Sequence, residues 1–306
     1  MSLMLACLLD FLLGDPPNRF HPTAWMGSLI AFLLRFRPRG NRFAELAFGA
    51  FILVTGLSLA IGAGWLMTAF AASLPLWAGI LVQATALKLT ISPRGLNRAA
   101  RAVQLALESG NLPEARRLLA WHLVSRNTSQ LDESKVSAAT IESVAENASD
   151  GVIAPLFFFA IGGLPAALAY RFANTADSML GYHDAEREWL GKIPARLDDL
   201  LNFIPARLTG LLITLAAFLA GANGGQAWRI LLRDAGQTAS PNAGFPMSAM
   251  AGALGVELEK IGHYTLGQGL AAPNAAGLAR ARRLFSLTIL LAILLFTVWG
   301  LYVQPR

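Results

Sequence analysis

The chain has 306 residues, of which 55% are hydrophobic and only 14% are charged, whereas soluble domains usually carry roughly 25% charged residues. Its net charge is +6, and basic residues gather at 35–42 and 280–283, next to apolar runs. That placement is typical of membrane anchors and not of a nucleic-acid interface, where basic and aromatic residues interleave. One cysteine and four histidines without metal-binding spacing argue against a disulfide, zinc or iron–sulfur protein. We therefore expect an integral membrane protein that binds no nucleic acid.

Residues 1–92 predict N-terminal helices followed by a transmembrane hairpin. The first apolar stretch lacks a basic start and a cleavage pattern, and Asp10 interrupts it, so we expect a retained helix too short to span a bilayer. A proline-rich turn follows at 15–22. Between Glu45 and Lys88 lie 42 residues without a charge, long enough for two membrane crossings. The sequence Ser73-Leu74-Pro75 offers a break between them.

The rest of the chain alternates polar helical and apolar stretches. Residues 93–150 form a polar helical segment with an acidic motif. Residues 151–228 hold apolar segments flanking a polar motif region, and Gly162, Gly163 and Pro165 predict that the run 151–170 is broken or re-entrant. Residues 229–283 are a polar loop and helix region, and 284–306 form the strongest single transmembrane helix. We therefore expect an all-α, multi-pass membrane protein forming a single domain, with about four to five apolar segments.

Acidic residues directly precede the run 151–170. Glu142, Glu146 and Asp150 are spaced four apart, so on one helix their carboxylates share a face. With Asn147 they offer the oxygen ligands that Mg²⁺ prefers. A solvated helix face ending in a turn is the structural alternative.

Two further polar clusters flank the apolar segments. The first cluster, around Arg171, places an arginine beside amide and hydroxyl groups, an arrangement that suits binding of a phosphate or carboxylate. The second cluster, around Asp198, could form another metal or substrate site. Alternatively, its aspartates could cap a helix and pair with neighbouring arginines. The first contains Arg171, Asn174, Thr175 and Asp177, and the second contains Asp198, Asp199, Asn202 and Arg207.

Two proline-rich loops complete the candidates. The loop 15–22 contains Asp15 and His21, and His21 is the best general-base candidate, although a lone loop histidine is more often structural. The loop 240–246 contains Asn242 and could hold a ligand or merely reverse the chain. No standard phosphate-binding loop, HExxH helix or GxSxG elbow is present.

Four long blocks resemble one family in order and content. They read LLDFLLGDPPNRFHPTAWMG, ATIESVAENASDGVIAPLFFFAIGGLPAALAYRFANTADSMLGY, ARLDDLLNFIPARLTG and SPNAGFPMSAMAGALGV. The resemblance is to the adenosylcobinamide-phosphate synthases, the CobD/CbiB cobalamin-biosynthesis proteins, and it runs from about residue 5 to residue 300. The sequence departs from the family pattern at Asn127, after Gly255, and at 183–192, so no role is carried to Asn127.

The resemblance implies an enzyme of the bacterial inner membrane with a cytoplasmic active site. Such an enzyme joins (R)-1-aminopropan-2-ol phosphate, or aminopropanol, to a carboxyl of adenosylcobyric acid with ATP and Mg²⁺ as co-substrate and cofactor. We expect Glu146, Asp150 and His21 to be catalytic and Arg171, Asn174 and Thr175 to hold phosphate. Metal ligands would come from Glu142, Glu146, Asp150, Asp198 and Asp199. Further substrate-binding candidates are Asp15, Asn147, Asp177, Arg207 and Asn242.

Other interpretations stay open on the sequence alone. They are a non-catalytic signalling protein resembling AmpE, an Asp-rich membrane prenyltransferase and a transporter. The first would not need the intact ENASDG and SPNAGFP blocks, and the second needs two facing Asp-rich motifs where only one loose candidate exists. The sequence also leaves open a homo-oligomer and association with other membrane enzymes of late cobalamin synthesis.

Overall fold

A computed structural model describes residues 1–181 and 188–303, and helices make up most of them. The prediction of an all-α membrane protein is confirmed. The chain divides into two compact units. The first comprises Met1–Ser92, Ala154–Asn202 and Leu295–Arg306, and the second comprises Pro93–Ile153 and Phe203–Leu294.

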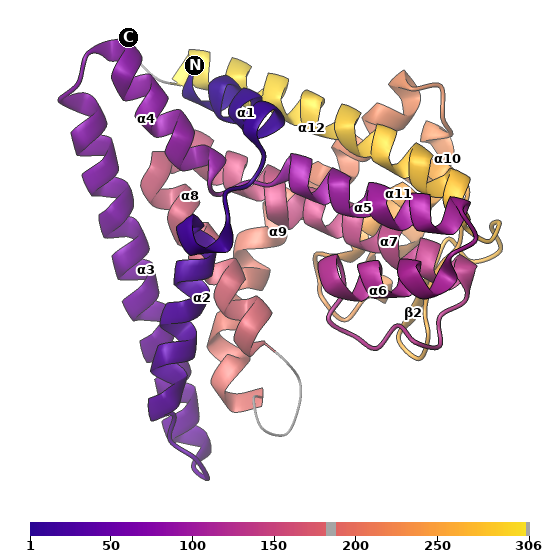
Figure 1. Cartoon of the computed structure of the whole chain (residues 1–306), viewed down its shortest axis with the longest axis horizontal. Coiled ribbons are helices and arrows are strands. Elements are labelled where there is room, and N and C mark those ends of the chain that lie inside the picture. The colour runs from indigo at the N-terminus through magenta and orange to yellow at the C-terminus, as the bar shows by residue number, and fades with distance from the viewer. Residues whose placement is uncertain (182–187, 304–306) are drawn as a thin grey trace. The chain divides into compact units, whose positions relative to one another are not determined.

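The first unit is built from apolar helices. They are α1 (Ser2–Leu13), η1 (Asn18–Phe20), α2 (Pro22–Leu33), η2 (Leu34–Phe36), α3 (Arg42–Ala72), α4 (Leu76–Lys88), α8 (Ala154–Leu180) and the first part of α9 (Glu188–Leu219). Helix α3 packs along α8, α2 lies against both, and α1 packs on α4 (Figure 1). The approach of α3 to α8 depends on small residues, because a Cβ on Gly56 would lie 1.7 Å from the Phe172 ring.

The second unit packs polar and amphipathic helices around a buried helix. Its elements are α5 (Pro93–Glu108), α6 (Leu112–His122), α7 (Glu133–Ala148), η3 (Ser149–Ile153), α10 (Gly224–Asp234), η4 (Ala235–Gln237), α11 (Gly244–Leu254), β1 (Leu258–Lys260), β2 (Tyr264–Leu266), the second part of α9 and most of α12 (Ala275–Val303). Helix α11 is apolar all round and almost fully buried, as expected for a core helix. It packs against α10 and α7, and the antiparallel hairpin β1–β2 packs against α7.

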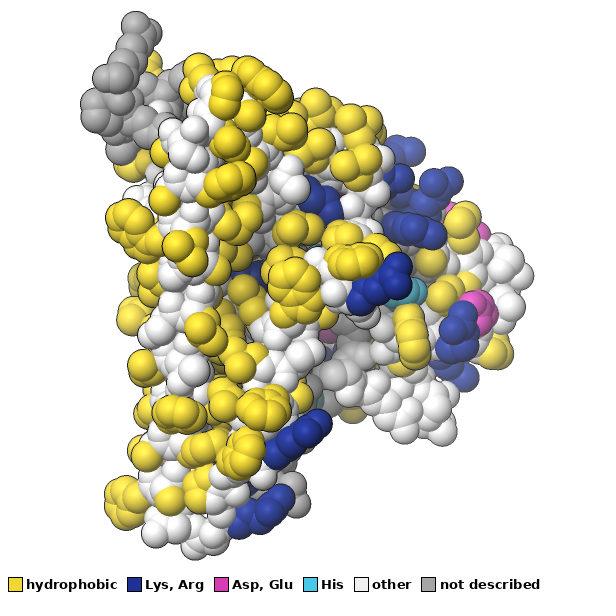
Figure 2. Space-filling model, turned by 60° about the vertical axis from the view of Figure 1, so that its left-hand side comes forward, with side chains coloured by type: hydrophobic (Ala, Val, Ile, Leu, Met, Phe, Trp, Pro, Cys, Tyr) yellow, Lys and Arg dark blue, Asp and Glu magenta, His cyan; other side chains and the backbone are white. Residues whose placement is uncertain are grey.

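Four helical runs are long and apolar enough to cross a membrane: Arg42–Ala72, Glu133–Leu180, Glu188–Leu219 and Ala275–Gly300. Helix α3 exposes large side chains along its length, including Phe51, Val54, Trp65, Leu66 and Phe70. Figure 2 shows hydrophobic side chains spread over the face on which α3 lies, with Lys and Arg side chains near its lower end. Such an apolar exterior is unusual in a soluble protein and is what a lipid-facing helix requires.

Most predicted helix breaks are found where the sequence placed them. Helix α3 ends before Ser73, and α8 loses helical geometry at Gly162 and Gly163. The prediction of two spans in the hairpin is wrong for its second arm, because α4 has only 13 residues, about 20 Å against a bilayer core of ~30 Å. The hairpin β1–β2 was not predicted, since strands of three residues are too short to show alternation.

Candidate active site

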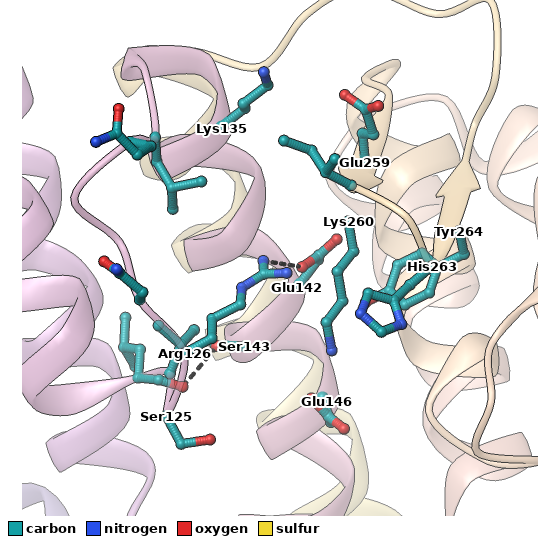
Figure 3. A pocket seen from close by; sticks show the side chains of 16 residues that line it. Ser125, Arg126, Lys135, Glu142, Ser143, Glu146, Glu259, Lys260, His263 and Tyr264 are labelled. Atoms are coloured by element: carbon teal, nitrogen blue, oxygen red, sulfur yellow. Dashed lines mark hydrogen bonds and ion pairs between the residues drawn. The ribbon is translucent and has the colours of Figure 1, made fainter.

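The second unit contains a cavity of about 580 Å³ that combines groups of opposite charge. It lies between α7, the segment 123–131 and the hairpin β1–β2 (Figure 3). Its charged lining residues are Arg126, Lys135, Glu142, Glu146, Glu259 and Lys260. The predicted carboxylates Glu142 and Glu146 therefore face a cavity, and the interpretation of this segment as an ordinary solvated helix face does not hold for them.

Glu142 is the least solvated acid of this cavity, with 5% of its surface exposed. Its Oε2 lies 3.4 Å from Nη2 of Arg126, while Oε1 is buried without a hydrogen-bond partner among the described residues. A buried carboxylate oxygen without a partner is costly and uncommon in native proteins. Glu142 Oε1 is therefore the atom of this cavity that most clearly lacks a ligand.

Tyr264 and Lys260 reach the same cavity from the hairpin. Burial raises the pKa of the Tyr264 phenol above its usual range, and the negative charges of Glu142 and Glu146 raise it further. Its hydroxyl therefore stays protonated and can donate a hydrogen bond; it interacts with the Glu142 carboxylate and lies 3.8 Å from Met247 Sδ.

The acidic motif changes geometry after Glu146. Asn147 donates to the carbonyl of Ser143 at 2.9 Å, and Asp150 lies in the π-helical turn η3. Because a π turn departs from the 3.6-residue period, the shared face predicted for the three carboxylates does not extend regularly to Asp150, which does not line the cavity. Within residues 1–181 and 188–303, no three His, Cys, Asp or Glu side chains gather closely enough to hold a metal ion by themselves.

A second cavity, of about 330 Å³, lies in the first unit and brings together three predicted residues, Asp15, His21 and Arg171. Asp15 Oδ1 lies 3.7 Å from Lys88 Nζ and 3.9 Å from His21 Nε2, and its Oδ2 accepts a hydrogen bond from Ser92. Burial opposes ionisation of Asp15, but these contacts outweigh it and hold its pKa below the usual range. Lys88, which is almost fully buried, was not predicted as a member of this cluster.

His21 uses both ring nitrogens in structural contacts. Its Nδ1 accepts a hydrogen bond from the backbone of Thr23 at 3.3 Å and so caps the start of α2. Nε2 is then the protonated nitrogen and faces Asp15. Action as a general base would require the contact with Thr23 to open, so a base role for His21 stays a prediction.

A chain of hydrogen bonds links α8 and the first part of α9. Asp198 accepts from Asn174 Nδ2 at 3.2 Å and from Asn202 Nδ2 at 2.9 Å. Asn174 Oδ1 accepts from Arg171 at 3.4 Å, and Asn202 Oδ1 accepts from Tyr170 at 2.8 Å. Both Asp198 oxygens thus accept hydrogen bonds from side-chain amides, and Asp198 itself lies inside α9. The alternative that Asp198 caps a helix is therefore wrong.

The remaining candidates lie on or beside these helices. Thr175 donates to the carbonyl of Arg171 at 2.7 Å. Asp177 lies on α8, and Asp199 follows Asp198 on α9. Their predicted roles in substrate and metal binding stay predictions.

Arg207 and Asn242 meet in the second unit. Arg207 Nη1 donates to Asn242 Oδ1 at 3.0 Å, and the guanidinium carbon lies 3.6 Å and 4.1 Å from the ring centroids of Phe203 and Phe245. These contacts fasten the loop 240–246 to α9 through hydrogen bonds and cation–π interactions. Substrate binding by this pair stays a prediction.

Comparison with known proteins agrees with the resemblance in the sequence. The family model for CobD/Cbib protein matches residues 3–288. A cobalamin biosynthesis protein CobD of Dehalococcoides mccartyi is 43% identical over 86% of this chain and 85% of its own length. A probable cobalamin biosynthesis protein CobD of Methanothermobacter thermautotrophicus is 41% identical over 94% of both chains, and a cobalamin biosynthesis protein CbiB of Salmonella typhi is 37% identical over 95% and 94%. No solved structure matches this chain. The chain therefore belongs to the CobD/CbiB family of cobalamin biosynthesis proteins.

Proposed function

We propose that this protein is an ATP- and Mg²⁺-dependent amide ligase of the inner membrane. It joins (R)-1-aminopropan-2-ol phosphate, or free aminopropanol, to a carboxyl group of adenosylcobyric acid, and with the phosphorylated amine the product is adenosylcobinamide phosphate. Family membership supports the pathway. The observation that carries the reaction class is the cavity of the second unit, where a buried carboxylate oxygen without a partner faces several basic side chains.

The chemistry explains why such a cavity is useful. A carboxylate does not react with an amine directly, so one corrin carboxylate oxygen first attacks the γ-phosphorus of ATP and ADP leaves. The amine then attacks the acyl carbon, inorganic phosphate leaves with that oxygen, and the ammonium proton passes to a base. Arg126, Lys135 and Lys260 line the cavity and would balance the phosphate charges in both steps.

The donor set also fits Mg²⁺, which proteins usually hold through one or two carboxylates while phosphate oxygens and water complete the shell. Glu142 and Glu146 would supply these carboxylates, since Glu142 Oε1 lacks a partner and Glu146 lines the same cavity. The ion would screen the negative charge of the phosphates. Asp150, Asp198 and Asp199 stay as further proposed ligands.

Residues of the first unit are proposed for phosphate binding. Arg171 lines the second cavity and, with Asn174 and Thr175, would hold a phosphate group. Glu146, Asp150 and His21 are the proposed bases. Of these, His21 would have to release its contact with Thr23 first.

The test is conversion of adenosylcobyric acid by the purified protein, with product identified by mass spectrometry. We expect turnover with either aminopropanol phosphate or aminopropanol, and only when ATP and Mg²⁺ are both present. Glu142→Gln should lower kcat at least about 100-fold, the usual cost of removing a transition-state or metal contact. Glu259→Gln is the matched control, because Glu259 lines the same cavity but is exposed.

Two results would count against the proposal. Wild-type protein that turns over neither amine would rule out the ligase activity. Near-normal activity of correctly inserted Glu142→Gln would remove this cavity from the reaction while leaving the activity itself standing.

A further inference from the structure

A third cavity, of about 470 Å³, lies in the second unit away from the residues proposed for catalysis. It is lined by the turn 220–223 after α9, by the end of α11 and by Arg280 and Arg283 near the start of α12. Both arginines are exposed, and neither makes an ion pair or side-chain hydrogen bond with any residue among 1–181 and 188–303. Arg280 and Arg283 thus border the cavity, and no acidic side chain of the described residues balances their charge.

Neighbouring helix ends are not capped by these arginines. Helices α9 and α11 both finish in glycine turns whose backbone N–H groups donate to carbonyls of the last helical turn, Ala222 to Ala217 and Val256 to Ala251. Arginine side chains often serve that purpose at a helix C-terminus. Arg280 and Arg283 donate to none of the described carbonyls of these helix ends, so their guanidinium groups are left for an external acceptor.

The cavity also lies where apolar helix surface gives way to polar surface. Phe218 and Leu219 are exposed at the end of α9, and the charge-free run of α12 begins directly after Arg283. Helix α10, which begins beside the cavity, exposes Trp228 and Leu232 while its other face is buried. An exposed tryptophan on an amphipathic helix at the end of two apolar spans is typical of the lipid headgroup region.

We propose that this cavity binds the phosphate group of an anionic phospholipid, with Arg280 and Arg283 as its ligands. Basic clusters at the ends of membrane spans favour the cytoplasmic leaflet, which carries the anionic lipids. The phosphate would lie between the two guanidinium groups, and the acyl chains would follow the exposed apolar surfaces of α9 and α12.

The experiment is a lipid titration of the full-length protein in detergent, followed by native mass spectrometry. The ligands are phosphatidylglycerol, phosphatidylcholine with the same acyl chains, and inorganic phosphate. Each basic side chain near an anionic lipid contributes about fivefold in affinity. The double variant Arg280→Gln/Arg283→Gln should therefore weaken phosphatidylglycerol binding roughly 25-fold and leave phosphatidylcholine binding almost unchanged.

Arg98→Gln/Arg101→Gln is the matched control, because these arginines are also exposed and three residues apart on a helix of the same unit. Equal weakening by both double variants, or equal binding of the two lipids by wild-type protein, would overturn the proposal. Displacement of phosphatidylglycerol by millimolar inorganic phosphate would also overturn it, in favour of a soluble phosphate ligand. If the first double variant fails to fold, each single variant should weaken phosphatidylglycerol binding about fivefold, and no change in either would refute the site.

Discussion

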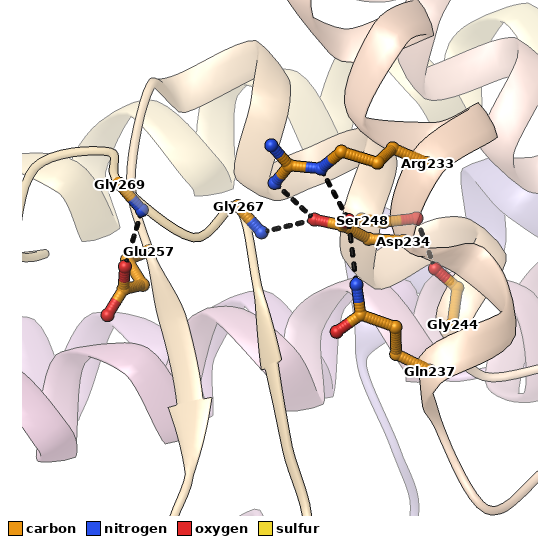
Figure 4. A network of polar contacts seen from close by, with 8 residues as sticks. All are labelled: Arg233, Asp234, Gln237, Gly244, Ser248, Glu257, Gly267 and Gly269. Atoms are coloured by element: carbon orange, nitrogen blue, oxygen red, sulfur yellow. Dashed lines mark hydrogen bonds and ion pairs between the residues drawn. The ribbon is translucent and has the colours of Figure 1, made fainter.

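Asp234 offers a sharp test of how the second unit is held together. It is fully buried and accepts hydrogen bonds from Arg233 at 2.6 and 2.8 Å, from Gln237 at 2.8 Å and from the backbone of Gly267 at 2.6 Å (Figure 4). These contacts tie the end of α10 to the turn that follows β2. Burial opposes ionisation, but the contacts with Arg233 and Gly267 outweigh it and lower the pKa of Asp234.

Asp234→Asn keeps the shape of the side chain but replaces one acceptor oxygen with a donor. Each Asp234 oxygen accepts two hydrogen bonds, so two are lost whichever way the amide turns. A hydrogen bond to a charged acceptor contributes about 1.5–3 kcal/mol, and the share from Arg233 is smaller because half of its side chain is exposed. We expect the free energy of unfolding to fall by about 2–3 kcal/mol, which corresponds to a Tm lower by roughly 5–10 °C.

The assay is thermal unfolding in detergent at several pH values. Because the folded-state pKa lies below the unfolded value of about 3.9, the stabilisation is fully present above pH ~4 and is lost as the pH falls through the folded pKa. The difference between wild type and variant should therefore shrink in acid.

Glu257→Gln is the control for this prediction. Glu257 also accepts a hydrogen bond from a backbone N–H of the same loop, that of Gly269 at 2.8 Å, but this bond is exposed. Glu257→Gln should therefore lower the free energy of unfolding by no more than about 1 kcal/mol. Equal Tm values of wild type and Asp234→Asn at pH 7, or a Tm difference that persists unchanged in acid, would show that the ionised Asp234 carboxylate does not stabilise this unit.

Two further substitutions test the packing and charge balance of the first unit. Gly56→Ala should lower the free energy of unfolding by about 1–3 kcal/mol, because its Cβ would overlap the Phe172 ring. The control Gly62→Ala, whose Cβ would meet open space, should raise that free energy by up to about 1 kcal/mol. Equal Tm shifts of the two variants would contradict the α3–α8 contact. Asp15→Asn should lower the Tm because buried Lys88 loses its counter-charge, and adding Lys88→Met should recover part of the loss. Absence of any recovery would show that Asp15 acts independently of Lys88.

Local sequence features predicted the helical framework well. Proline and glycine disfavour helix wherever they occur, so the breaks at Ser73–Pro75 and Gly162–Gly163 could be located without tertiary information. The length of α4 was also available, because only 13 residues run from Pro75 to the end of the charge-free run at Lys88, too few for a full span. The burial of Lys88 could not be predicted, because it depends on tertiary packing.

The candidate sites were only partly predictable, because long-range contacts create them. Helical spacing placed Glu142 and Glu146 on one face, but Lys260 and Tyr264 reach them from a hairpin more than 100 residues later. Arg126 could have been found, since it precedes the residue at which the chain departs from the family pattern. The meeting of Asp15 and Arg171 in one cavity required the folded chain.

In the proposed reaction, a corrin carboxylate is activated as an acyl phosphate before the amine attacks. The most direct test uses adenosylcobyric acid labelled with ¹⁸O in its carboxyl group, with purified protein, ATP, Mg²⁺ and aminopropanol phosphate. We expect one ¹⁸O atom to appear in inorganic phosphate for each amide formed, because the attacking carboxylate oxygen leaves with the phosphoryl group. Product formation with the label in AMP, or with no label in any phosphate, would contradict it.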